Sequence, residues 1–163
     1  MSRGSLLLAR LADHEHLVPA AEILEHSDIV EGWNAVDGHI NLVAKLKAPS
    51  QQLVDQIRGL GGAQELEVIQ LSDETGTFRC DPSLCSSFVF LEVEAAKLAD
   101  VLSRLSTLQQ VAFCSSRQGS SELIAVVNGA TYQLLDRTID ELIRPIDGVL
   151  RLKRDRVINL KQL

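Results

Sequence analysis

The chain has 163 residues, of which 45% are apolar and 23% charged, the balance of a folded globular protein. Its net charge of −6 and its low aromatic content of 4% argue against a general nucleic-acid-binding role. Three cysteines, an odd number, argue against a disulfide framework, and no apolar run is long enough for a signal peptide or membrane span. We therefore expect a cytoplasmic protein without membrane association.

The first half of the chain predicts two helices among four strands. Leu17, Ala20, Ala21 and Leu24 have the spacing of three and four that gives a helix one apolar stripe. Ser50 is a good N-cap for the second helix. Strands are predicted at residues 6–11, 29–36, 40–47 and 66–71. In residues 40–47 apolar and mostly polar residues alternate, which predicts one buried and one wetter face.

A linker is predicted at residues 73–85, because this segment is rich in Ser, Asp, Thr, Gly and Pro. It would separate a first unit, residues 1–72, from a second, residues 86–163.

The second half repeats the same succession of elements. Strands are predicted at residues 88–93, 111–115, 123–127 and 149–160, with an interruption of the last near Asp155. A helix is predicted over residues 98–105, and another begins after the N-cap Thr131 and presents Leu135, Ile139 and Leu142.

An internal repeat relates the two halves. Residues 5–57 align without a gap to residues 86–138, and the ten identities include Leu17/Leu98 and the glycines Gly38/Gly119. We expect both glycines to adopt the positive φ that hairpin turns demand. The predicted fold is therefore α+β, with two tandem ferredoxin-like βαββαβ units and antiparallel sheets.

Residues 26–46 resemble the effector-binding domain of the Lrp/AsnC transcription regulators, which has a Gly-x-x-Asp loop between its second and third strands. Gly38-His39-Ile40-Asn41 stands at that loop with Asn in place of Asp, and Gly119-Ser120-Ser121-Glu122 stands there with Glu. Residues 145–149, Pro-Ile-Asp-Gly-Val, match the turn before the family's last strand. The resemblance covers most of both halves.

The resemblance implies a site, a ligand and an assembly. It places a small-molecule effector, such as an amino acid, at Gly38, His39, Asn41, Gly119, Ser120 and Glu122. It also implies a homo-oligomer or an intramolecular pseudo-dimer. The family's helix-turn-helix has no counterpart here, since the chain begins directly with a strand, so no direct DNA binding is expected. The alternative for both loops is that the glycines only make tight turns.

No catalytic or metal site is predicted, and no cofactor. His14 and His16 lie at the start of a helix, and zinc needs three or four convergent ligands. The spacing of Cys80 and Cys85 is too loose for a redox pair. Cys114 is interpreted as a small core residue.

Two further features carry open alternatives. Trp33 is interpreted as covering a sheet face or a contact between the two copies. The basic residues Arg151, Lys153, Arg154 and Arg156 would either protect an edge strand, the interpretation we favour, or contact an anionic partner.

The sequence thus favours a non-enzymatic sensing or regulatory module. The alternative function is a protein-binding chaperone or assembly module that uses a sheet edge. A third is an enzyme, since some relatives of the family act on tetrapyrrole carboxylates.

Overall fold

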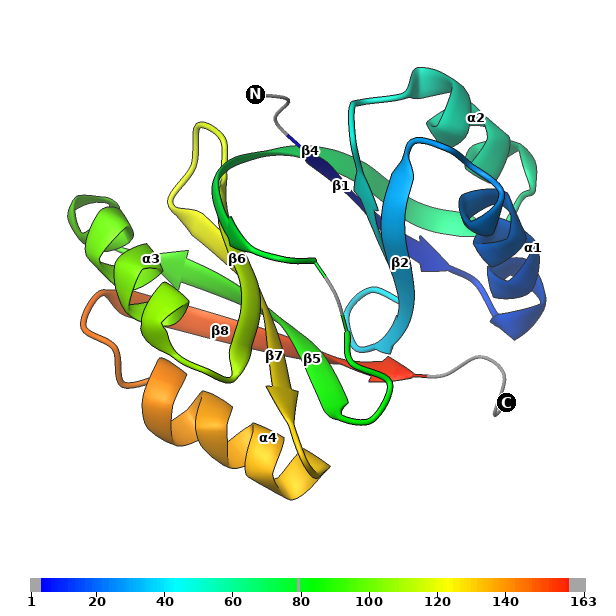
Figure 1. The fold of residues 1–163 in the computed structure, drawn as a ribbon. Helices are drawn as coiled ribbons and strands as arrows, with labels where there is room; N and C mark the ends of the chain where they lie inside the picture. The colour runs from blue at the N-terminus through cyan, green and yellow to red at the C-terminus, as the bar shows by residue number, and fades with distance from the viewer. Residues whose placement is uncertain (1–3, 79, 159–163) are drawn as a thin grey trace. The chain divides into compact units, whose positions relative to one another are not determined.

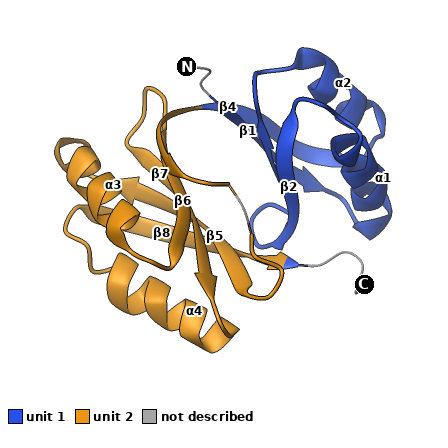
Figure 2. Cartoon of the chain, in the orientation of Figure 1, with its two compact units in different colours: residues 1–70, 158–163 blue, residues 71–157 orange. Residues whose placement is uncertain are grey.

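The computed structural model describes residues 4–78 and 80–158, in which helices and antiparallel strands form an α+β fold (Figure 1). The chain divides into two compact units (Figure 2). Unit 1 comprises residues 1–70 and 158–163, and unit 2 comprises residues 71–157. The prediction of an α+β class with antiparallel strand pairing is confirmed.

Unit 1 has a sheet with the order β4-β1-β3-β2, which is the order of a ferredoxin-like unit. Asp13 and Ser50 cap the two helices by accepting backbone N–H bonds from the first turn. The elements are β1 (Ser5–Leu11), α1 (His14–Glu25), β2 (Val30–Asp37), β3 (Leu42–Leu46), α2 (Gln51–Gly59) and β4 (Ala63–Gly76).

The core of unit 1 lies between its two helices and one face of its sheet. Leu7 of β1, Leu24 of α1 and Ile57 of α2 belong to one buried cluster. Trp33 of β2 packs against the same cluster, and its indole N–H donates to Glu25 of α1 at 2.6 Å. Trp33 therefore covers a sheet face, on the helix side.

Strand β3 has no wetter face, which corrects the expectation drawn from its alternating sequence. All five of its residues are buried, including Lys45. The Lys45 ammonium group lies 2.7 Å from the Glu31 carboxylate of β2. This pairing explains how a charged residue occupies a buried strand, because an unpaired buried charge is costly.

Unit 2 has the same strand order in β8-β5-β7-β6. The end of β4 extends this sheet, because Leu71 pairs with Arg117 and Gly76 pairs with Phe113 on β6. The elements are β5 (Cys85–Val93), a 3₁₀ turn (Ala95–Lys97), α3 (Leu98–Thr107), β6 (Val111–Arg117), β7 (Glu122–Gly129), α4 (Tyr132–Thr138), a π-helical turn (Ile139–Ile143) and β8 (Val149–Ile158).

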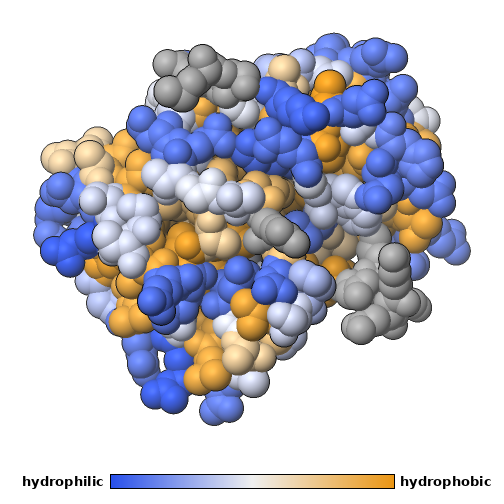
Figure 3. Space-filling model, in the orientation of Figure 1, coloured by the Kyte–Doolittle hydropathy of each residue, from blue (hydrophilic) through white to orange (hydrophobic). Residues whose placement is uncertain are grey.

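The core of unit 2 is built in the same way as that of unit 1. Leu91, Leu105 and Leu135 belong to one buried cluster, and Cys114 lies in it, as predicted. Burial raises the pKa of the Cys114 thiol, so the group stays protonated at neutral pH. Apolar side chains are also exposed over α4, at the lower edge of the view in Figure 3.

Two predicted features of the second half differ in the structure. The segment predicted as a linker, residues 73–85, begins inside β4 and ends at the first residue of β5. Strand β8 runs through Asp155 without interruption, and Asp155 is buried opposite Phe88. The predicted residues 159 and 160 of this strand lie outside the described residues.

In the described part of the chain, no helix has the length and apolar character needed to cross a membrane.

Candidate functional site

The turn between β6 and β7 is held in one conformation by local hydrogen bonds. Gly119 has a φ of +75°, as predicted, a backbone conformation that residues other than glycine adopt at a cost in free energy. The Ser120 N–H donates to the Arg117 carbonyl at 3.2 Å, and the Glu122 N–H donates to the Ser120 hydroxyl at 3.0 Å. The turn therefore presents short polar side chains on a fixed backbone.

A cavity of about 440 Å³ lies beside this turn, within unit 2. Its walls come from the end of β6 and the turn, from the start of α3 and its preceding 3₁₀ turn, and from β4. The lining residues are Ser72, Asp73, Ala95, Leu98, Ser116, Arg117, Gly119, Ser120 and Ser121. Four of these nine residues are serines and two, Asp73 and Arg117, are charged, so the cavity offers hydrogen bonds beside an apolar patch at Ala95 and Leu98.

The β4 wall of the cavity is fixed to β6 by serine hydroxyls. Ser115 and Ser116 both donate to the Ser72 carbonyl, at 2.8 and 2.9 Å. The Ser72 and Ser116 hydroxyls lie 3.0 Å apart. These bonds anchor β4 where its register with β6 shifts, and they place the next residue, Asp73, at the cavity.

The charges at the cavity are only partly compensated. The Arg117 guanidinium lies 3.3 Å from the Glu122 carboxylate, and both side chains are half-exposed. Among the described residues, no hydrogen bond or ion pair involves the Asp73 carboxylate. The cavity therefore has one carboxylate whose charge is available to a bound molecule.

The corresponding turn of unit 1 is occupied by its own backbone contacts. The Asn41 amide accepts from the Leu11 N–H and donates to the Leu11 carbonyl, each at 2.9 Å. Arg10 donates to the carbonyls of Gly38 and His39 at 3.2 and 3.1 Å. Gly38 does not have a positive φ, which corrects the prediction for this glycine.

The six predicted ligand-binding residues thus lie in two different settings. Gly119 and Ser120 line the cavity, and Glu122 pairs with the lining residue Arg117. Gly38, His39 and Asn41 lie at a turn whose backbone and Asn41 side chain are already bonded within unit 1. Their role in binding stays a prediction.

Sequence reasoning missed the β4 and α3 walls of the cavity. Ser72 and Asp73 stand at the border of a segment with a linker composition, and nothing local shows that this segment pairs with β6. Ala95 and Leu98 carry no polar signal. Ser116 and Arg117 directly precede the predicted turn, so extending the candidate loop by three residues would have found them.

A second cavity, of about 600 Å³, lies in unit 1 between the end of α1 and the start of α2. Among the described residues that line it, His26 is the only titratable one, and the other polar groups are Ser27, Ser50, Gln52 and Gln56. It has no carboxylate or cation of fixed charge, so it offers a ligand less electrostatic recognition than the cavity in unit 2.

The histidines and cysteines do not assemble a reactive centre in the described residues. There, no three His, Cys, Asp or Glu side chains converge as a metal site would require. His16 pairs with the helix cap Asp13, whose pKa this bond lowers. Burial raises the pKa of Cys80 to about 11, so its thiol is a poor nucleophile at neutral pH.

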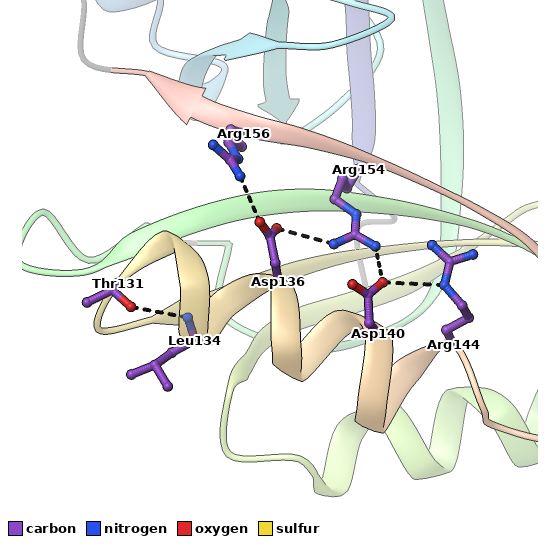
Figure 4. A network of polar contacts seen from close by, with 7 residues as sticks. All are labelled: Thr131, Leu134, Asp136, Asp140, Arg144, Arg154 and Arg156. Atoms are coloured by element: carbon purple, nitrogen blue, oxygen red, sulfur yellow. Dashed lines mark hydrogen bonds and ion pairs between the residues drawn. The ribbon is translucent and has the colours of Figure 1, made fainter.

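Basic residues of β8 bind carboxylates of α4 and of the π-helical turn that follows it, within unit 2. Arg154 contacts Asp136 at 3.2 Å and also pairs with Asp140, while Arg156 lies 2.7 Å from Asp136 (Figure 4). Arg144 joins the network from the other side of Asp140, an ion pair that the helix spacing predicts. Arg154 and Arg156 therefore tie a strand to its covering helix.

This network predicts a specific response to acid. The Arg154 guanidinium holds the pKa of Asp140 below its ordinary value of 3.8. A carboxyl group whose pKa is lower in the folded than in the unfolded state stabilises the folded state at pH values above the unfolded-state pKa. That stabilisation is lost as the pH falls through the folded-state pKa. We expect Asp140→Asn to flatten the decline of unfolding free energy below about pH 4. Urea unfolding between pH 2.5 and 6 measures it.

The control for this prediction is Asp28→Asn, which removes an exposed carboxylate of unit 1. It should leave the acid limb as steep as in the unsubstituted protein. An equally flattened limb in both variants would show that the network with Arg154 is not the source of the effect.

The fold and the cavity together define an antiparallel α+β domain of ferredoxin-like type with a small polar cavity at a hairpin turn. Residues 86–159 match the family model described as the Lrp/AsnC ligand binding domain. This range contains β5 except its first residue, all of β6 to β8, and the turn residues Gly119, Ser120 and Ser121 of the cavity. Among curated protein sequences, none matches the chain.

Solved structures with the same fold cover nearly all of this chain. The siroheme decarboxylase NirDL is 10% identical, with a TM-score of 0.72 over 96% of this chain and 71% of its own. A protein of Lactobacillus acidophilus NCFM named "putative monooxygenase" is 10% identical, with a TM-score of 0.61 over 96% and 92%. An anthrone oxidase-like protein is 11% identical, with a TM-score of 0.52 over 98% and 92%.

These neighbours correct the expectation that the chain is not an enzyme. A decarboxylase and proteins named as oxygenase and oxidase share the fold over almost the whole chain. The expectation rested on the lack of a recognisable catalytic motif in the sequence. The lack of such a motif is not a sound criterion, because function resides in individual sites and a fold of this kind accommodates enzymes.

Proposed function

We propose that this chain binds a small molecule in the cavity at the β6–β7 turn of unit 2, and that the molecule carries a carboxylate, as an amino acid does. The observation that carries the proposal is the combination of a fixed glycine turn, serine hydroxyls and Arg117 around one cavity. The match of residues 86–159 to a ligand-binding family supports it.

The carboxylate would bind at the turn. Hydroxyl groups of Ser120 and Ser121 line that side of the cavity and can donate to an anion. Arg117 adds a cationic group there, and its partner Glu122 holds it at the rim. The Arg117 guanidinium has several N–H groups, so it can donate charge-assisted hydrogen bonds to a ligand carboxylate and to Glu122 at the same time.

Binding would serve regulation by way of stability and assembly. A molecule that binds only the folded chain stabilises it by mass action, and it shifts any assembly whose members differ in affinity. The family match favours this regulatory, sensing role, with further copies of the chain as partners.

Thermal unfolding with a panel of the twenty common amino acids at 10 mM tests the proposal. We expect at least one to raise the midpoint by several degrees, since a ligand at one hundred times its Kd adds about 2.7 kcal/mol. Ala95→Trp should abolish this rise, because an indole at this exposed lining position would fill the cavity mouth.

The matched control is Ala96→Trp, at an exposed neighbour that does not line the cavity. It should keep the full ligand response. If no amino acid shifts the unsubstituted protein, the proposal fails. If the Ala95 and Ala96 variants respond alike, the ligand binds elsewhere.

A further inference from the structure

Asp73 occupies an unusual position in the wall of the cavity. It is the only non-glycine residue with a positive φ in the described part of the chain, at +56°. It lies at the register shift between β4 and β6, where two residues of β4 are left out of the regular pairing. Asp is one of the few residues that tolerate this conformation, at a cost that surrounding contacts must offset.

The contacts that offset this cost are the serine bonds on the preceding residue. Ser115 and Ser116 are both buried, and both spend their hydroxyl donors on the Ser72 carbonyl. The Ser72 hydroxyl contacts Ser116 as well. The bulge is therefore held by three side-chain bonds, which fix the backbone direction at Asp73.

The Asp73 carboxylate is the anionic group of this wall. Among the described residues it takes part in no hydrogen bond or ion pair, although Arg117 lines the same cavity. Arg117 is instead 3.3 Å from Glu122. The cavity thus has a compensated cation on the turn side and an uncompensated anion on the β4 side.

We infer that Asp73 is a specificity-determining residue that binds a cationic amino group of the ligand. This inference rests on the proposed function, in which the turn side takes the ligand's carboxylate. A ligand with both groups would match both walls, while a hydroxy acid of the same shape would leave Asp73 without a cationic partner. Binding of an amino group by a carboxylate is a charge-assisted hydrogen bond.

The β4 wall lies outside the part of the chain that the family model matches. The family model matches residues 86–159, and Asp73 lies before that range. The segment that joins the two halves of the chain supplies Asp73 by pairing with β6. The position is thus suited to give this chain a preference that the domain alone does not carry.

The test compares each amino acid that stabilises the protein with its 2-hydroxy analogue, by calorimetric titration. For the unsubstituted protein we expect the amino compound to bind about tenfold more tightly. For Asp73→Asn we expect the ratio to fall to about one, since Asn tolerates the positive φ but carries no charge. Glu141→Gln, which removes a charge from outside the cavity, should keep the tenfold ratio.

The outcomes separate the inference from the proposed function. If ligands bind and Asp73→Asn keeps the tenfold preference, the inference is overturned while the binding site stands. If no ligand binds the unsubstituted protein, both fail. If Asp73→Asn weakens the amino and hydroxy compounds equally, Asp73 shapes the cavity and does not recognise the amino group, which also overturns the inference.

Discussion

Gly76→Ala should lower the free energy of unfolding by about 3 kcal/mol. Gly76 ends β4 with a φ of +80°, and a Cβ at this position would overlap the carbonyl oxygen of Ala112 on β6. This oxygen accepts the hydrogen bond from the Thr77 N–H at 2.9 Å. The new methyl group would therefore force β4 away from β6, since neither contacting atom is on a flexible side chain.

Gly119→Ala is the matched control for Gly76. Its φ of +75° is nearly the same, but a Cβ there would meet nothing within 4 Å. We expect it to cost only the strain of the left-handed backbone, about 1 kcal/mol. Urea unfolding followed by circular dichroism measures both variants. Equal losses would show that the close approach to Ala112 has no energetic weight.

The Gly76 variant has a second expected consequence, at the cavity. Ser72 and Asp73 lie on the part of β4 that pairs with β6. Displacement of the strand end should therefore move these two residues outward and widen the cavity. The ligand response of the Gly76 variant should therefore fall more than that of Gly119→Ala, measured by titration below the unfolding midpoint.

Leu135→Ala should lower the free energy of unfolding by about 3 kcal/mol, as removal of a fully buried leucine side chain does. Leu135 lies in the core cluster of unit 2 and is 0% exposed. The cavity left behind would be lined by packed strand and helix residues with little room to collapse. The backbone of Leu135 also packs closely on Gly129 of β7, which limits the relaxation of α4.

Leu134→Ala is the control for this second prediction. Leu134 is the neighbouring residue of the same helix and is 47% exposed. Its truncation should change the unfolding free energy by no more than about 0.5 kcal/mol. Circular dichroism at 222 nm with urea follows both variants. A loss of similar size in both would contradict the assignment of α4's buried face.

The leucines of α4 also show how far the sequence predicts the core. The aligned repeat pairs Leu134 with Leu53, which is buried on α2. The helical spacing instead selects Leu135, Ile139 and Leu142. The structure confirms the first two as buried, whereas Leu142 is exposed and the next residue, Ile143, is buried in its place. Periodicity within a helix was therefore a better guide to the buried face than residue identity between the halves.

The candidate site was predictable only in its local part. The glycine turn at Gly119 follows from the sequence, because a positive φ is a local demand that few residues other than glycine meet. The hydrogen bonds that occupy Asn41 and the ion pairs that occupy Arg154 were not predictable, since their partners are 30 and 14–18 residues away. The burial of Lys45 was not predicted for the same reason, since its partner Glu31 lies on another strand.

The sequence by itself determined the α+β class, the order of helices and strands, the two N-caps Ser50 and Thr131, and most of the core positions of the helices. All of these depend on residues within a few positions of one another. Only the tertiary structure decided that β4 continues past its expected end at Leu71 and pairs with β6, bringing Ser72 and Asp73 to the cavity. Strand pairing between distant segments is set by which backbone groups and buried faces find partners, and no short stretch of sequence records it.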